Sequence, residues 1–238
     1  MSEPPLNPEF DRYAADYDAA LERGLSVSGE DKDYFARERL LHLARCCAQL
    51  GFHPDRALDF GCGIGSAAPF FLEAFPELRQ LIGTDLSPQS LDVARRRHGD
   101  RRVEFRLLSE HAPRADLDLV FCNGVFHHIP PVRRAGAVRE IQERLRPGGL
   151  FALFENNPWN PGTRYVMSRI PFDRDAITLS PLAARRLVAA GGFELLRTDF
   201  LFVFPRALSW LRPLERHATR LPLGAQYLVL ARKPNGPA

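Results

Sequence analysis

The stretch from Arg56 to Asp85 constrains the fold of this chain more than any other part of the sequence. An apolar run at 57–60 is followed directly by three glycines at alternate positions. Residues 66–75 then carry apolar side chains at helical spacing, and a second apolar run begins at Leu81. Short apolar runs bounded by glycine are typical of buried strands. The stretch therefore predicts a strand, a glycine turn, a helix and a second strand, which is the repeating unit of an α/β fold.

The glycine turn also predicts a ligand. Gly61, Gly63 and Gly65 follow the first predicted strand directly. Glycine has no Cβ and adopts positive φ readily, so a ligand can lie against the backbone there. Asp85 lies about 20 residues beyond the last glycine, at the end of the second predicted strand. An acid at this distance binds a ribose hydroxyl in nucleotide-binding α/β folds, so we expect a nucleotide-type ligand.

The residues around the glycines distinguish two kinds of nucleotide site. A dinucleotide fingerprint has its third glycine five residues after the first, where this chain has Ser66. The segment 59–65, Asp-Phe-Gly-Cys-Gly-Ile-Gly, instead resembles motif I of the class I S-adenosylmethionine (SAM)-dependent methyltransferases. A dinucleotide-dependent oxidoreductase remains an alternative, although the sequence has no Tyr-x-x-x-Lys pair. A non-catalytic SAM-fold protein is a second alternative; the intact Asp59, glycines and Asp85 argue against lost cofactor binding and leave lost methyl transfer open.

The resemblance implies a Rossmann-like, seven-stranded, mostly parallel sheet with helices on both faces and an antiparallel last strand. We expect a single class I methyltransferase domain over residues 1–238. It would comprise an N-terminal helical lid (1–52), a SAM-binding core (53–155), and a cap with the C-terminal strands (156–238). In that family the N-terminal segment covers cofactor and substrate. Tyr17 and Arg37 are therefore candidates for the methionine end of the cofactor, Arg37 for its carboxylate.

By the same resemblance, the glycine turn and two acids hold the cofactor. Gly61, Gly63 and Gly65 would let the methionine and ribose approach the backbone. Asp85 would bind the ribose hydroxyls through charge-assisted hydrogen bonds. Asp59 would orient the methionine ammonium.

Four further cofactor contacts follow from position along the chain. Leu86, directly after Asp85, would pack on the adenine. Ser109 or Glu110 stands where the family usually has an acid near the adenine amine. Asn123, at the end of the predicted fourth strand, would present its backbone carbonyl near the ammonium.

The candidate catalytic residues follow the predicted fourth and fifth strands. The segment 124–130, Gly-Val-Phe-His-His-Ile-Pro, resembles the motif after strand four in small-molecule methyltransferases. An imidazole can take a proton from a nucleophile, so His127 and His128 are candidate bases. Glu155 begins a stretch that resembles a Glu-His-Asn-Pro-x-Asn-Pro signature, with Asn156 in place of the histidine. Glu155 is thus a third acid–base candidate, and all three side chains equally suit structural roles in turns.

Composition and charge limit the partners that we expect. The net charge is +3 and acids are interspersed among the arginines, so no nucleic-acid footprint is evident. The four cysteines lack CxxC spacing, which predicts no metal site and suits a reducing compartment. The sequence shows neither a signal-peptide pattern nor an apolar run of membrane-spanning length. We expect a cytoplasmic monomer or homodimer that methylates a small molecule, with oxygen favoured over nitrogen or carbon as the acceptor.

Overall fold

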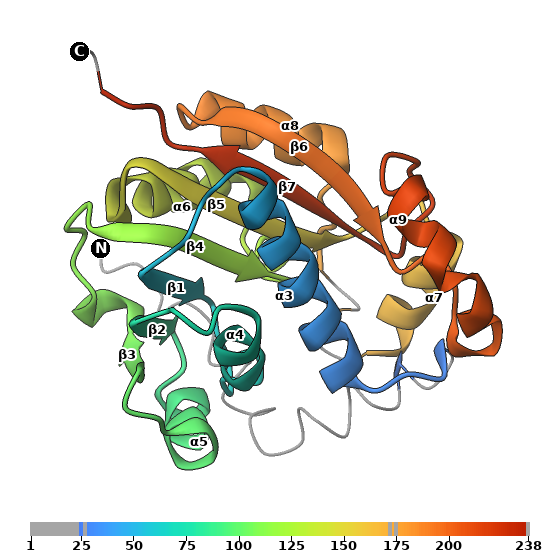
Figure 1. Cartoon of the computed structure of the whole chain (residues 1–238), viewed down its shortest axis with the longest axis horizontal. Coiled ribbons are helices and arrows are strands. Elements are labelled where there is room, and N and C mark those ends of the chain that lie inside the picture. The colour runs from blue at the N-terminus through green and yellow to red at the C-terminus, as the bar shows by residue number, and fades with distance from the viewer. Residues whose placement is uncertain (1–23, 26–27, 171–172, 174–175, 237–238) are drawn as a thin grey trace.

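The centre of the molecule is a seven-stranded sheet in the order β3-β2-β1-β4-β5-β7-β6 (Figure 1). The computed structural model describes residues 24–25, 28–170, 173 and 176–236. The strands are β1 (Arg56–Phe60), β2 (Gln80–Asp85), β3 (Val103–Leu107), β4 (Leu117–Asn123), β5 (Leu145–Asn156), β6 (Glu194–Leu201) and β7 (Gln226–Arg232). β1 to β5 pair in parallel, whereas β7 pairs antiparallel with both β5 and β6. The predicted Rossmann-like α/β fold with an antiparallel last strand is confirmed.

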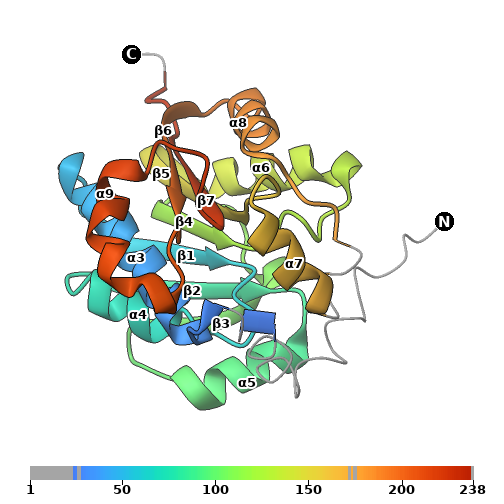
Figure 2. The same cartoon turned by 90° about the vertical axis from the view of Figure 1, so that its right-hand side faces the viewer.

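Helices cover both faces of this sheet (Figures 1 and 2). The helices in the described part of the chain are α3 (Lys32–Gln49), α4 (Ala68–Ala74), α5 (Pro88–His98), α6 (Pro131–Arg144), α7 (Pro161–Arg169), α8 (Pro181–Ala190) and α9 (Glu215–Ala218), with the 3₁₀ helices η2 (Leu108–Glu110) and η3 (Arg206–Leu214). α3, α4 and α5 contribute to one buried apolar cluster, and α6 and α8 contribute to the other. The central strands are buried on both sides because each face packs on helices, as is usual for a parallel sheet.

Local sequence explains where several of these helices begin. Ser87, Asn160 and Ser180 each precede a proline, and each side chain accepts a hydrogen bond from a backbone N–H of the first turn. The capping oxygen satisfies one of the free amides, and proline fits the first helical position, where no amide partner is needed. α5 thus begins at Pro88 directly after Asp85 and Leu86, which fixes these two residues at the carboxyl edge of the sheet.

The N-terminal helical region was predicted as a lid, and α3 belongs to it. α3 begins at Lys32, directly after Asp31, whose side chain accepts a hydrogen bond from the amide of Tyr34. Tyr17, in the predicted lid, lies outside the described residues. α7 and α9 lie beyond the carboxyl ends of β1 and β4, at the right of Figure 1.

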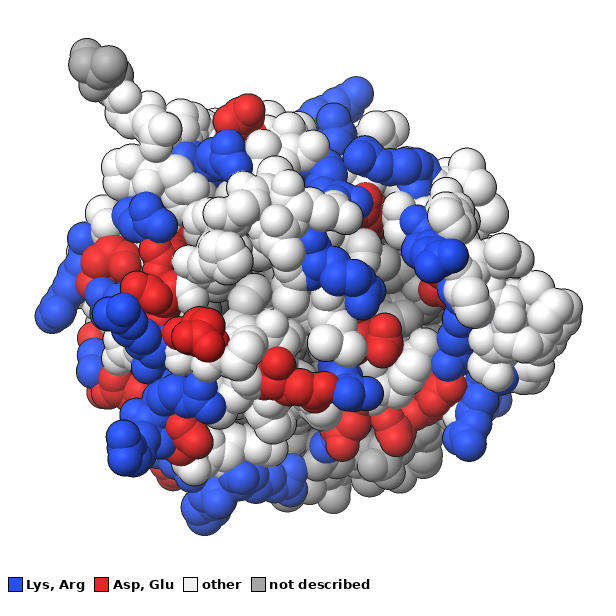
Figure 3. Space-filling view, in the orientation of Figure 1, with Lys and Arg blue, Asp and Glu red and all other residues white. Residues whose placement is uncertain are grey.

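Charged side chains of both signs are interspersed on the face shown in Figure 3. This face carries no extended field of one sign. Within the described part of the chain, no helix combines the length and apolarity needed to cross a bilayer.

Candidate active site

A cavity of about 980 Å³ runs along the carboxyl ends of β1, β2, β4 and β5. Ligands of open α/β sheets bind at this edge. The start of α3, the helix α7 and the segment 202–205 line its outer side. Its volume lies near the upper end of the range for small-molecule sites, roughly 300–1,000 Å³.

The three glycines after β1 differ in what surrounds them. Gly63 lines the cavity with a φ of +53°, and a Cβ built there would point into open space. Gly61 has a φ of +76°, and its Cβ would come within 2.5 Å of Val125 Cγ2. A Cβ on Gly65 would lie 2.8 Å from Phe105 and 3.0 Å from Ala94. Gly63 therefore offers backbone to a ligand, whereas Gly65, which does not line the cavity, permits close packing of the turn on α5 and β3.

Asp85 is joined directly to the glycine turn. Its Oδ2 accepts a hydrogen bond of 2.8 Å from the amide of Gly63, and its Oδ1 accepts one of 2.9 Å from the amide of Ser87. These bonds fix the carboxylate at the rim of the cavity. Leu86 also lines the cavity, and 49% of this residue is exposed, so it presents an apolar surface to a ligand.

Asp59 is the second acid of the site. It lies at the end of β1, lines the cavity and is buried. Burial and the neighbouring Asp85 raise the pKa of Asp59 to about 7, against the opposing effect of Arg39. Near neutral pH the carboxyl group is therefore close to the midpoint of its titration. A bound cation favours the carboxylate, so affinity for a cationic ligand should rise as the pH increases through about 7 and level off above it.

Asn123 lines the same cavity at the end of β4. Its buried side-chain Oδ1 has no hydrogen-bond partner among the described residues. Buried polar atoms are nearly always hydrogen-bonded, so this oxygen marks a place for a donor from a ligand. The open space over Gly63, the fixed Asp85 and this acceptor together fit a ligand with a ribose and an ammonium group, as SAM has.

His127 and His128 stand on the other side of the cavity and both contact Asp173. His127 Nε2 and His128 Nε2 lie 3.4 and 3.3 Å from Asp173 Oδ1. His127 Nδ1 lies 2.6 Å from Glu155 Oε2. Burial opposes a charged imidazole, but the carboxylates of Glu155 and Asp173 outweigh it and raise the pKa of His127 to about 10. His128 is the more exposed imidazole of the pair, with 18% of its side chain exposed against 3% for His127.

Glu155 does not line the cavity, which corrects its predicted place. It is 1% exposed and lies behind His127, and its second oxygen accepts a hydrogen bond of 2.7 Å from the amide of Phe126. Side chains along β5 alternate between the two faces of the sheet, so Glu155 lies on the same face as Phe151 and Leu153, which pack with α6 and α8. Glu155 therefore positions His127 and has no direct access to a substrate.

Three predicted cofactor contacts are likewise not at the cavity. Arg37 is paired with Glu73, with Nε 2.8 Å from Oε1, at the exposed outer surface of α3. Two residues along a helix turn about 200°, so Arg39 lines the cavity instead and donates to Gln226 Oε1 at 2.8 Å. Glu110 accepts a hydrogen bond from the amide of Leu107, and neither it nor Ser109 lines the cavity, although Leu108 does.

Asp173 was missed by the sequence analysis. It lies 46 residues from His127 along the chain, and no motif in the sequence links the two. Only the folded arrangement of α7 and the loop after it brings the carboxylate to the histidines. Tyr17, the remaining cofactor candidate, lies outside the described residues.

Comparison with known proteins finds a methyltransferase domain in this chain. Residues 58–151 match the family described as Methyltransferase domain. A trans-aconitate 2-methyltransferase from Methylobacterium nodulans is 31% identical over 158 residues, which are 66% of this chain and 57% of the relative. A demethylmenaquinone methyltransferase from Deinococcus radiodurans is 30% identical over 134 residues, 54% of either chain. The chain thus spans little more than half the length of these curated relatives.

The fold agrees with that match. A TehB-like SAM-dependent methyltransferase from Corynebacterium glutamicum superposes with a TM-score of 0.58 and 19% identity, covering 96% of this chain and 100% of that one. At this identity the likeness concerns the fold alone. The sequence match spans β1 to the first half of β5 and therefore contains the glycine turn, both acids and the histidine pair. Residues 58–151 therefore form a methyltransferase domain, and the fold of the chain is that of SAM-dependent methyltransferases.

Proposed function

We propose that this chain transfers a methyl group from SAM to an oxygen atom of a small molecule. The observation that carries the proposal is a single cavity in which the glycine turn with Asp85 faces the pair His127 and His128. One side suits a nucleoside with an amino-acid tail, and the other suits a polar acceptor atom.

The cofactor side is built from groups that bind and orient. SAM supplies an electrophilic methyl group on a sulfonium. Asp85 would accept hydrogen bonds from the ribose hydroxyls, and the backbone at Gly63 would lie against the ligand. Asp59 and Asn123 Oδ1 would accept hydrogen bonds from the methionine ammonium group. Holding two reactants in attack geometry contributes several kcal/mol to such a transfer, roughly 7–11 in well-oriented reactions.

The acceptor side combines apolar walls with one polar cluster. The apolar side chains at the cavity come from the turn after β4, from α7 and from the strand end after β6: Val125, Ile129, Val166, Met167, Ile170, Phe202 and Phe204. His127, His128 and Asp173 are the polar groups beside them. This arrangement suits an apolar molecule with a hydroxyl or carboxyl group directed at the histidines. The two curated relatives are named for small-molecule acceptors, which supports a small molecule here. A base role for His127 or His128 stays a prediction, as do the cytoplasmic location and a monomeric or dimeric state.

A panel of matched acceptors tests the reaction. Ring compounds that are identical except for one hydroxyl, carboxyl or amino group are incubated with the protein and SAM, and S-adenosylhomocysteine (SAH) formation is measured. We expect SAH to form with members that carry hydroxyl or carboxyl groups and to remain at background with their amino counterparts. Methyl transfer to the amino compounds alone would contradict the proposed oxygen acceptor. It would support a nitrogen acceptor, which is an alternative that the sequence left open.

A further inference from the structure

The polar cluster on the acceptor side has the geometry of a metal centre. We propose that His127, His128 and Asp173 bind a divalent transition-metal ion at the wall of the cavity. The two Nε2 atoms and the Asp173 carboxylate lie within 4.8 Å of one another, and the residues come from two separate loops. This proposal revises the sequence-based expectation that the chain has no metal site.

The distances between these atoms are compatible with coordination of one ion. Asp173 Oδ1 lies 3.4 Å from His127 Nε2 and 3.3 Å from His128 Nε2. A good N–H···O hydrogen bond is about 2.9 Å long. Ligands about 2.0–2.1 Å from a tetrahedral ion lie about 3.3–3.4 Å from one another. The two nitrogen-to-oxygen distances therefore match those between ligands of a common ion.

The groups behind the ligands are those that a metal-binding histidine requires. His127 Nδ1 lies 2.6 Å from Glu155 Oε2, and Glu155 Oε1 accepts the Phe126 amide at 2.7 Å. A carboxylate on Nδ1 holds the imidazole proton there and orients Nε2 toward Asp173, where the ion would bind. The carboxylates of Glu155 and Asp173 would balance the charge of a divalent ion. The nearby guanidinium of Arg134 donates to the backbone carbonyls of Ile129 and Ile177 and leaves these carboxylates to the histidines.

Backbone hydrogen bonds hold the two loops together. The amide of Ile177 donates to the carbonyl of His127 at 3.1 Å, and the amide of Asp173 donates to the carbonyl of Ile170 at 3.1 Å. Asp173 is thus bonded to the end of α7, and Ile177 is bonded to the turn that carries the histidines.

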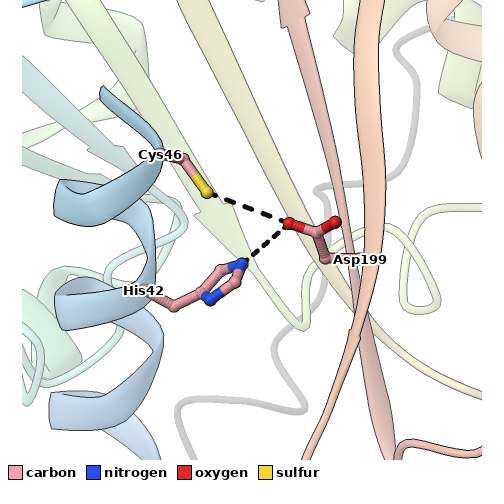
Figure 4. A group of neighbouring side chains, drawn as sticks. All are labelled: His42, Cys46 and Asp199. Carbon is pink, nitrogen blue, oxygen red and sulfur yellow. Dashed lines mark hydrogen bonds and ion pairs between the residues drawn. The ribbon is translucent and has the colours of Figure 1, made fainter. Parts of the chain in front are cut away.

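The described residues contain a second cluster of possible metal ligands, formed by His42, Cys46 and Asp199 (Figure 4). Here His42 Nε2 makes a 2.8 Å bond to Asp199 Oδ2, and Arg197 Nε lies 2.7 Å from the same oxygen. Arginine already neutralises this carboxylate. None of the three residues lines the cavity, so this cluster serves packing and supplies a matched control.

The donor set indicates the kind of ion and its use. Two imidazoles and one carboxylate suit Zn²⁺, Mn²⁺ or Fe²⁺ better than Mg²⁺ or Ca²⁺, which prefer oxygen ligands. All three ligands line the cavity, so the remaining coordination positions face the acceptor. An ion there would bind the acceptor oxygen and ease loss of its proton. This use of the ion rests on the proposed function, whereas the site itself does not.

Calorimetric titration of the chelator-treated, SAM-free protein with Zn²⁺ tests the site. We expect one ion per chain, with affinity reduced at least tenfold in His128→Ala and in Asp173→Asn. Cys46→Ser should leave the affinity unchanged, because it alters only the second cluster. Circular dichroism and a separate SAM titration establish that each variant is folded.

The proposal is overturned if wild-type protein binds no Zn²⁺, if both cavity variants keep wild-type affinity, or if Cys46→Ser removes binding. Because Zn²⁺ binding is measured without SAM, its failure is distinguishable from failure of the proposed function. A protein that binds SAM but no Zn²⁺ would keep the methyltransferase assignment and lose only the metal site.

Discussion

Replacing Asp85 by alanine is expected to weaken SAM binding about 100-fold or more. The carboxylate would accept the ribose hydroxyls, and hydrogen bonds to a charged group contribute roughly 1.5–3 kcal/mol each. Two such bonds correspond to about 3 kcal/mol or more, and about 1.4 kcal/mol is a factor of ten in affinity. The substitution also releases the amides of Gly63 and Ser87 from Asp85, so the turn itself would loosen. Isothermal titration calorimetry measures the dissociation constants of SAM for the wild type and for Asp85→Ala.

The matched control for Asp85→Ala is Asp92→Ala. Asp92 lies on α5, the helix that follows Asp85, and its exposed carboxylate pairs with Arg95 Nη1 at 2.8 Å, away from the cavity. We expect SAM affinity to be unchanged in this variant. Equal affinity of the wild type and Asp85→Ala would show that the ribose-binding role assigned to Asp85 is wrong.

Substitution of Gly63 by valine is expected to abolish SAM binding while the protein stays folded. The added side chain would occupy the open space over the turn, where the ligand would lie against the backbone. The left-handed conformation costs a non-glycine residue roughly 1–2 kcal/mol, and the cost is at the upper end for a β-branched side chain. The loss of SAM affinity should therefore be larger than the small loss of folding stability can explain. Calorimetry and thermal unfolding of the same samples measure both effects.

Gly51→Val provides the control for this backbone cost. Gly51 has a φ of +61°, its Cβ would also meet open space, and it lies outside the cavity. Both variants should lose a similar amount of thermal stability, and only Gly63→Val should lose SAM binding. A Gly63→Val protein that binds SAM as the wild type does would refute the close approach of the ligand to this turn.

Local patterns in the sequence predicted the alternation of strands and helices, whereas the seven-stranded sheet with its antiparallel last strand followed from the family resemblance. The alternation of short apolar runs with helical segments fixed the order of elements, and the glycine turn and Asp85 marked the cavity. These features are readable because each depends on a few neighbouring residues. Gly63 and Asp85 proved to be linked by a hydrogen bond, which the spacing of the motif had not indicated.

The residues placed wrongly, and the one missed, depend on orientation or on distant contacts. Arg37 and Arg39 are equally plausible in sequence, and only the rotation of α3 decides which of them reaches the cavity. Glu155 is polar at a strand end, yet the pleat of β5 turns it behind His127. Asp173 joins the histidines through a loop that no local pattern places there. Tertiary packing determines these orientations and contacts, so they cannot be predicted from local patterns in a single sequence.

Parallel calorimetric titrations of the wild-type protein with SAM, SAH and NAD test the central claim most directly. We expect micromolar binding of SAM and SAH and no binding of NAD. SAM affinity should be about tenfold lower at pH 6 than at pH 8, because Asp59, with a pKa of about 7, must lose its proton to accept the ammonium. Binding of NAD without SAM would contradict the account, and the glycine turn would then be a dinucleotide site.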